Sequence, residues 1–515
     1  MKKQTFIQGG LILAAMGIVS KFLGLFFRFP LIQMIGDEGM GYYQLAFPIF
    51  AIFIAIASGI PIALSKIISE NNGTGKEADN VSLVTISTKI LVVLAIIAGI
   101  VIFLFKDLLI KAFGWDPKVV YCVMGISIAP IFVAIINPIR GYFQGYQNMN
   151  ATAISQFLEQ LGRVVFGVGL AVLFLPKGIE FAAAGAVIGA SLGGALASIY
   201  LVFKFMMVRP KHIKKSVTPT RKLVKSIIMT ATPIAIGAVI ISVIGFIETS
   251  IVPKQLLEAG YTQSEATILF SQFTGKAMTL THIPLTLSIA IGSALIPVIA
   301  SSRALNNLKE LSNNIGMSFK ACFVIALPCT FGMFFLAEPI MATLFPGNDG
   351  GADILKYLSI TIPFLVMSQI TTAILQGLGK MKFPVFTTVG CSILKVILTY
   401  KLVAIKEFNI EGAVISSIVA YSLMAILNMA YLKYHTRFRV SWGEILFKPL
   451  LASLIMMIVA LGSFLIAIDI IKIVSVTCMM SIALGGIVYV ILAFVFKIFD
   501  YEYIKGKVTD RIGKR

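Results

Sequence analysis

Charged side chains stand inside long apolar stretches of this 515-residue chain. Lys21 and Arg28 are seven residues apart, so on a helix they lie two turns apart on one face. Glu159 and Arg163 have the i, i+4 spacing that permits an ion pair, and Lys395 stands at the corresponding depth of a later stretch. A charge inside a bilayer costs about 2.5 to 3.5 kcal/mol on insertion scales, so such residues are functional candidates. We expect these five residues to line a substrate cavity and the cations among them to bind an anionic group.

Three other residues are weaker candidates for the same cavity: Lys276, His282 and Glu248. Each of them also fits a purely structural position, the lysine and the glutamate at the membrane interface and the histidine packed between helices. Structural roles are open for the stronger candidates too. Basic side chains near helix ends extend towards water, and an i, i+4 pair can serve its own helix alone.

Catalytic and metal-binding patterns are missing from the sequence. It contains three histidines and no H-E-x-x-H, G-x-S-x-G or phosphate-binding glycine loop. Its five cysteines fall in apolar runs without a C-x-x-C spacing, so we expect small buried side chains. We therefore expect no enzyme, no metal site and no cofactor, which disfavours a membrane glycosyltransferase or acyltransferase. If the protein is a pump, its energy would come from a coupling ion, the membrane potential or the gradient of the substrate itself.

The composition requires a lipid environment for the elements that position these residues. Apolar types make up 58% of the chain and charged types 13%, which excludes a water-soluble globular protein. Continuous apolar runs predict helices rather than barrel strands, since each span must satisfy its own backbone in lipid. The sequence predicts an all-α integral membrane protein with about fourteen transmembrane helices. Their approximate ranges are 6–27, 42–65, 84–105, 119–138, 152–175, 182–203, 226–248, 277–300, 318–337, 354–376, 384–404, 412–432, 447–468 and 473–496.

The basic residues predict the orientation of these helices. The net charge is +20, and 28 of the 43 Lys and Arg residues fall on the side of the N-terminus against 11 on the other side. Because positive charge gathers in cytoplasmic loops, we expect both termini in the cytoplasm and no nucleic-acid partner. Eight of these residues stand between 204 and 225 without an acid among them, which fits either a topology-setting linker or a contact with anionic membrane lipids.

Short repeats predict two similar lobes. Phe143-Gln144-Gly145 recurs as Leu375-Gln376-Gly377, and the same spacing carries Arg163 onto Lys395. An even repeat of six helices keeps both copies in one orientation, so the lobes would face each other across a central cleft. We predict an N-terminal lobe over residues 1–205, a basic linker over 206–225 and a C-terminal lobe over 226–433. Two additional helices and a basic tail follow over 434–515.

Several of these segments resemble a known family. They read RGYFQGYQNMN at 140–150, SQFLEQ at 155–160, KFLG at 21–24, GDEG at 36–39 and GIPIALSK at 59–66. These motifs are similar to those of the stage V sporulation protein B group, in the oligosaccharide flippase branch of the MOP superfamily. Lipid II flippases and MATE drug exporters are relatives of that group.

The resemblance implies a two-lobed, MATE- or MurJ-like flippase of the cytoplasmic membrane. Its cargo would be a polyprenyl-diphosphate-linked saccharide, in this group a peptidoglycan precursor for the spore cortex or cell wall. It also implies that basic residues of the first helix, here Lys21 and Arg28, serve the cavity. An ion-coupled exporter of small amphipathic compounds is the alternative, and it would need a decisive cavity carboxylate rather than several cations. A monomer is compatible with either reading.

Overall fold

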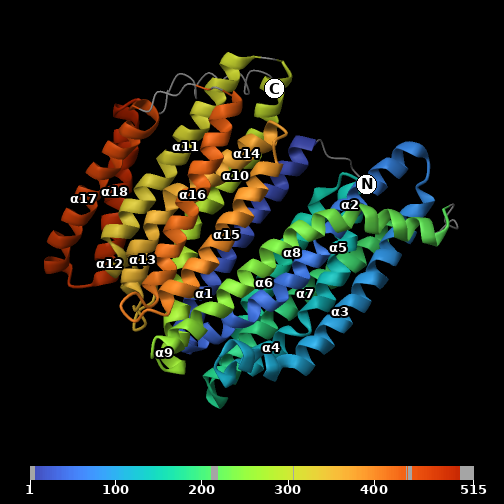
Figure 1. Cartoon of the computed structure of the whole chain (residues 1–515), viewed down its shortest axis with the longest axis horizontal. Coiled ribbons are helices and arrows are strands. Elements are labelled where there is room, and N and C mark those ends of the chain that lie inside the picture. Colours follow the sequence, from blue (N-terminus) through green and yellow to red (C-terminus); the bar gives the residue numbers. More distant parts are fainter. Residues whose placement is uncertain (1–5, 210–217, 306, 437, 439–442, 499–515) are drawn as a thin grey trace. The chain divides into compact units, whose positions relative to one another are not determined.

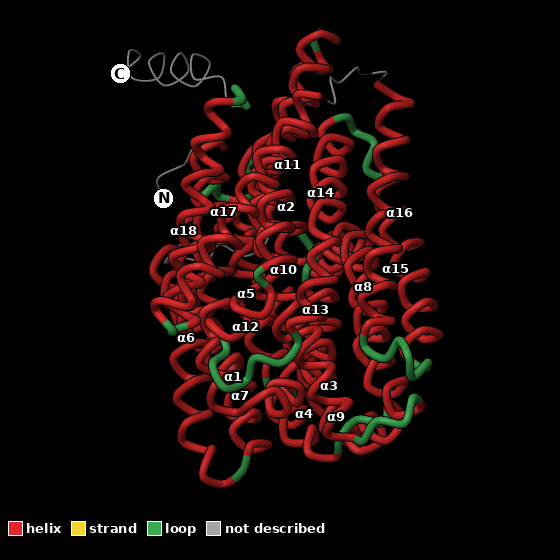
Figure 2. Tube along the Cα trace, turned by 90° about the vertical axis from the view of Figure 1, so that its left-hand side faces the viewer, coloured by secondary structure: helices red, strands yellow, loops and turns green. Residues whose placement is uncertain are grey.

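The computed structural model describes residues 6–209, 218–305, 307–436, 438 and 443–498. The described residues form helices joined by short loops, with no strand among them (Figure 2). Residues 210–217 of the predicted basic linker and the end of the predicted tail from 499 onward lie outside this description. The chain divides into two compact units, residues 1–271 with 403–409 and residues 272–402 with 410–515.

The described residues of the first unit form nine α-helices, which are labelled in Figure 1. Their bounds are Phe6–Ala57 (α1), Gly59–Thr74 (α2), Ala78–Phe113 (α3), Val120–Ile126 (α4), Ala129–Gly145 (α5), Met149–Phe174 (α6), Ile179–Val208 (α7), Thr220–Glu258 (α8) and Gln263–Ser271 (α9). The apolar core of α2, α3 and α5 includes the fully buried side chains of Leu64, Leu83 and Phe143. By contrast, Ile97, Leu104 and other side chains of α3 are more than half exposed, as expected of a lipid-facing helix.

The second unit begins with a π-helical segment, Gln272–Ala277, and also contains nine α-helices in its described residues. They are Met278–Ala304 (α10), Leu308–Phe335 (α11), Ala337–Leu344 (α12), Ala352–Leu358 (α13), Ile362–Gly377 (α14), Lys382–Val403 (α15), Glu411–Thr436 (α16), Lys448–Ile471 (α17) and Val474–Val495 (α18). Its core is formed by α10, α11 and α14, around Ile315, Ile370 and other buried aliphatic side chains.

Thirteen ranges among the described residues are long and apolar enough to cross a membrane. The first, Ala15–Thr74, has 60 residues and would be about 90 Å long as one helix, roughly three bilayer cores. The backbone leaves helical geometry at Gly36, where φ is 68° and ψ is −175°. This range therefore corresponds to the first two predicted runs, and each of the other twelve overlaps one further run. The predicted all-α membrane fold is confirmed.

The helix α8 packs within the first unit, although the sequence assigns it to the C-terminal lobe. It contacts α1, α2 and α3, and a Cβ atom added at Gly59 would lie 2.3 Å from the carbonyl oxygen of Ala231. At the other end of α8, Phe246 meets the rings of Phe113 and Trp115. The predicted lobes, 1–205 and 226–433, describe an internal duplication of the sequence and not packing contacts. Their boundaries stay a prediction.

The repeated Phe/Leu-Gln-Gly segments make the same contact in each unit. Gly145 ends α5 against α2, where an added Cβ would lie 2.7 Å from the side chain of Ile68. Gly377 ends α14 against α10, where an added Cβ would lie 2.9 Å from the side chain of Ile299. Only a residue without a side chain permits either approach. This shared geometry supports the duplication that the repeats suggest.

Candidate functional site

Glycines of α7 bring α6 unusually close and so set the backbone of the candidate residues on α6. A Cβ atom at Gly193 would lie 2.3 Å from the carbonyl oxygen of Glu159 and 2.7 Å from the backbone nitrogen of Arg163. One turn earlier on α7, a Cβ at Gly189 would lie 2.2 Å from Gly167 of α6. Small residues that let helix backbones approach are typical of packing in membranes. The α6–α7 pair is thus a rigid support for the Glu159 and Arg163 side chains.

Arg140 of α5 is the closest cationic partner of Glu159 among the ion pairs of the first unit. Its Nη2 atom lies 3.0 Å from Oε2 of Glu159, and its Nε donates a hydrogen bond of 2.9 Å to Oγ of Ser155. Ser155 is fully buried and donates in turn to the carbonyl oxygen of Thr152 at 2.7 Å. Because Ser155 and Glu159 are one turn apart, a single guanidinium group binds two adjacent positions of α6.

The predicted pair between Glu159 and Arg163 exists, but it is the looser of the two. Oε1 of Glu159 lies 3.9 Å from Nη2 of Arg163, beyond hydrogen-bond distance. The guanidinium group of Arg163 lies over the ring of Phe47, 5.4 Å from its centroid. Its Nε atom is buried and has no hydrogen-bond partner among the described residues. A buried donor without a partner is a candidate for binding a ligand.

Arg28 belongs to the same cluster. It lies near enough to Arg163 and Tyr43 to interact with both electrostatically. The centre of the Tyr43 ring lies 4.7 Å from that of Phe47, the ring over which Arg163 lies, so Tyr43 is near both arginines. The helix that carries Arg28 touches α6 directly, since a Cβ at Gly24 would lie 2.8 Å from Nε2 of Gln160.

We call Arg28, Arg140, Arg163 and Glu159 the arginine cluster. It combines three guanidinium groups with one carboxylate. Guanidinium groups bind phosphate oxygens in two-point contacts. The cluster is therefore suited to an anionic, phosphate-bearing ligand. Lys21 also lies on α1, but its side chain is outside the described residues.

Lys395 is buried in the second unit, between α15 and α16. Its exposed fraction is 3%, and its Nζ lies 3.4 Å from the hydroxyl oxygen of Tyr421 and 5.1 Å from the centre of that ring. The predicted position inside an apolar helix is thus confirmed. The idea that Lys395 and Arg163 meet the same ligand stays a prediction.

Lys276 has a structural role that explains its burial. It is fully buried in the π-helical segment, and its ammonium group donates to the carbonyl oxygens of Asn348 and Gly350. It also lies 5.2 Å from the centre of the Phe345 ring. The lysine therefore holds the loop between α12 and α13, and its position relative to the membrane interface stays a prediction. His282 of α10 and Glu248 of α8 are partly buried in their helices.

Arg140 is the site residue that the sequence places wrongly. The apolar run ends at residue 138, so the sequence assigns Arg140 to a loop, whereas α5 continues to Gly145. Its side chain is 14% exposed and paired with Glu159. The signal was the i, i+4 spacing of Ser155 and Glu159, which presents two acceptors to a neighbouring helix. Apolarity alone does not mark the end of a helix that is buried against protein.

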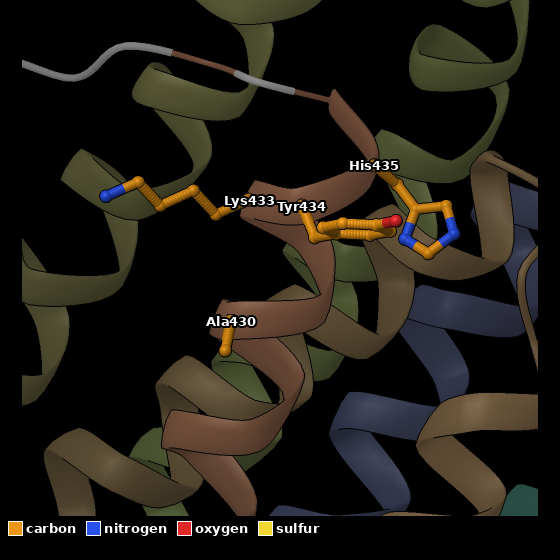
Figure 3. Close-up of a pocket in the computed structure, with 4 residues that line it drawn as sticks. All are labelled: Ala430, Lys433, Tyr434 and His435. Carbon is orange, nitrogen blue, oxygen red and sulfur yellow. The ribbon is translucent and has the colours of Figure 1, made fainter.

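A shallow hollow of about 700 Å³ at the end of α16 does not form a site. Ala430, Lys433, Tyr434 and His435 line it. Figure 3 shows the ammonium group of Lys433 directed away from the ring of His435, so the two side chains do not converge. They stand in the last turn of α16, where positive charge stabilises the negative end of the helix dipole.

No group of three or more His, Cys, Asp or Glu side chains that could hold a metal ion occurs in the part of the chain that the structure describes. All five cysteines are free thiols, four of them buried.

Comparison with known proteins identifies relatives over most of the chain. Residues 6–303 match the family described as polysaccharide biosynthesis protein, and residues 274–401 match the MatE family. Stage V sporulation protein B of Bacillus subtilis (strain 168) is 29% identical over 440 residues, covering 84% of each chain. Lipid II flippase MurJ of the same organism is 27% identical over 453 residues, covering 83% of this chain and 82% of the relative.

The fold is also similar to that of a solved transporter. A structure of lipid II flippase MurJ in an inward closed conformation matches with a TM-score of 0.71 and 16% sequence identity. The match covers 94% of this chain and 98% of that one.

Proposed function

Because the chain belongs to the polysaccharide biosynthesis protein family and to the MOP superfamily of transporters, we propose that it is a flippase for a lipid-linked saccharide. The cargo is a saccharide joined through a diphosphate to a polyprenyl chain, and it crosses the cytoplasmic membrane by alternating access. Both termini lie in the cytoplasm, as the distribution of basic residues predicts. The relatives named above support a peptidoglycan precursor of the lipid II type, used for the spore cortex or the cell wall.

The observation that carries this proposal is the excess of guanidinium groups in the arginine cluster. Arg28 and Arg163 are near enough to interact electrostatically, and the carboxylate of the cluster has its closest contact with Arg140. A diphosphate is an anionic group that guanidinium groups bind in two-point contacts. Phe22 and Phe26 are 37% and 60% exposed on α1, the helix that also carries Arg28, and they provide an apolar surface for the polyprenyl chain.

The energy source is part of the same proposal. Flipping uses no bound cofactor and draws on a coupling ion or on the membrane potential, which acts on the unloaded cationic site. An inside-negative potential is worth about 2.3 kcal/mol per elementary charge per 100 mV, enough to bias the return of an empty carrier.

A second candidate function is an ion-coupled exporter of small amphipathic compounds. The match of residues 274–401 to the MatE family favours it. Cationic drugs would need a cavity carboxylate, and Glu159 is already paired with Arg140 and Arg163. The arginine cluster therefore favours the anionic cargo.

Reconstitution in liposomes separates the two candidates. The purified protein is combined with a fluorescent polyprenyl-diphosphate disaccharide, and an impermeant quencher measures its movement between leaflets. We expect flipping above the rate of empty liposomes and no ion-driven transport of ethidium. Ethidium transport without movement of the lipid-linked disaccharide would contradict the proposal.

A further inference from the structure

The face of α6 that enters the arginine cluster offers one carboxylate to two arginines. Ser155, Glu159 and Arg163 follow each other at intervals of one turn, so all three side chains project to the same side. Arg140 comes from α5 and takes the first two positions, through Nε to Ser155 and Nη2 to Glu159. Arg163 is left with the more distant oxygen of Glu159, at 3.9 Å.

This division is not a consequence of the helix alone. An i, i+4 pair of glutamate and arginine can close to hydrogen-bond distance on any helix, and this one has not closed. The difference is the competing contact of 3.0 Å with Arg140, which orients the carboxylate. The guanidinium group of Arg140 is itself held in place, because its Nε donates a hydrogen bond to the fully buried hydroxyl group of Ser155.

We propose that Arg140 is a positioning residue that keeps Arg163 available for the substrate anion by occupying Glu159. Without Arg140, the carboxylate of Glu159 turns to Arg163, forms a close i, i+4 ion pair with it and neutralises the charge of Arg163. The buried Nε of Arg163, which has no partner in the described part of the chain, marks the donor that is kept available. The inference rests on the proposed function, because it assigns a ligand phosphate to that donor.

Binding of farnesyl diphosphate to the full-length protein in detergent tests this inference, with farnesol as the probe that lacks the phosphates. Arg140→Gln is expected to weaken farnesyl diphosphate binding about tenfold or more, the usual effect of losing one charge-assisted contact. The double variant Arg140→Gln, Glu159→Gln should bind farnesyl diphosphate within about threefold of the wild-type affinity, because no carboxylate remains to neutralise Arg163. Arg140→Lys keeps a cation beside Glu159 and should bind better than Arg140→Gln.

Glu159→Gln by itself provides a test that does not depend on the folding of an arginine variant. It removes the carboxylate and keeps both arginines, so we expect binding at least as tight as that of the wild type. Glu444→Gln is the matched control, because it removes the carboxylate of another i, i+4 pair, Lys448 with Glu444 at 3.0 Å in the second unit. That control should leave binding unchanged.

The outcomes distinguish the two proposals. Farnesyl diphosphate binding no tighter than farnesol binding in the wild type would contradict the proposed function, and the inference with it. Wild-type binding that survives Arg140→Gln, or that the double variant fails to restore, would overturn the inference alone. Loss of binding in Glu159→Gln would do the same, since it would make the carboxylate a substrate contact.

Discussion

At the scale of single residues, the structure changes the expected consequence of removing Arg163. From the sequence, its loss would strand Glu159 as an unpaired charge in the membrane. In the structure Glu159 keeps Arg140 at 3.0 Å, so the carboxylate remains compensated when Arg163 is replaced. The effects of Arg163 on function and on stability can therefore be separated.

Arg163→Gln should reduce flipping about tenfold or more, as expected for one lost charge-assisted contact, and leave the unfolding temperature nearly unchanged. Flipping in liposomes and thermal unfolding in detergent measure the two effects. Lys66→Gln, which breaks an exposed i, i+4 pair at 3.9 Å, should change neither quantity. Wild-type flipping by Arg163→Gln would mean that the residue is structural and that the diphosphate binds elsewhere.

At the scale of elements, the close contact between α6 and α7 decides where the arginine cluster stands. The contact depends on glycines that face the backbone of α6, so it is sensitive to a single methyl group. Gly169 of α6 faces open space, and it allows a comparison with the same chemical change.

Gly193→Ala places a methyl group 2.3 Å from the carbonyl oxygen of Glu159 and must push α6 away from α7. We expect a loss of about 1 to 3 kcal/mol in stability, the usual range for overpacking, together with reduced flipping. Gly169→Ala on α6 is the control, since nothing lies within 4 Å of its added Cβ. Equal unfolding temperatures and flipping rates for the two variants would show that the helices are not in such close contact.

At the scale of the whole molecule, the helix count predicts on which side of the membrane each loop lies. Between Lys222 and Asp349 the chain crosses three times, through α8, through α9 with α10, and through α11. An odd number of crossings places these two exposed residues on opposite sides. The excess of basic residues predicts that Lys222 lies inside the cell.

Labelling of Lys222→Cys and Asp349→Cys in intact cells tests this orientation. An impermeant maleimide should label the cysteine at 349 from outside and the one at 222 only after the membrane is opened. The unmodified chain should remain unlabelled, because its five free cysteines lie within apolar helices and four of them are buried. Labelling of both positions from outside would contradict the predicted number of crossings.

The sequence by itself determined the secondary structure and the membrane class of this protein. Continuous apolar runs can satisfy their backbone in lipid only as helices, so their number and ranges follow from composition along the chain. The charges within these runs were visible for the same reason, since each one contrasts with its apolar neighbours. Glu159, Arg163 and Lys395 could be identified without any coordinates.

The tertiary structure alone decided which groups the charged side chains contact. That Glu159 prefers Arg140 to Arg163 depends on the distance between α5 and α6, which no spacing along one helix encodes. From the sequence, Lys276 fits a cavity or an interfacial position. The structure adds that its ammonium group donates hydrogen bonds to two loop carbonyl oxygens. A charge in an apolar run indicates that the side chain needs a partner. Which partner it receives depends on packing between distant segments, because electrostatic contacts act over a few ångströms in space and not along the chain.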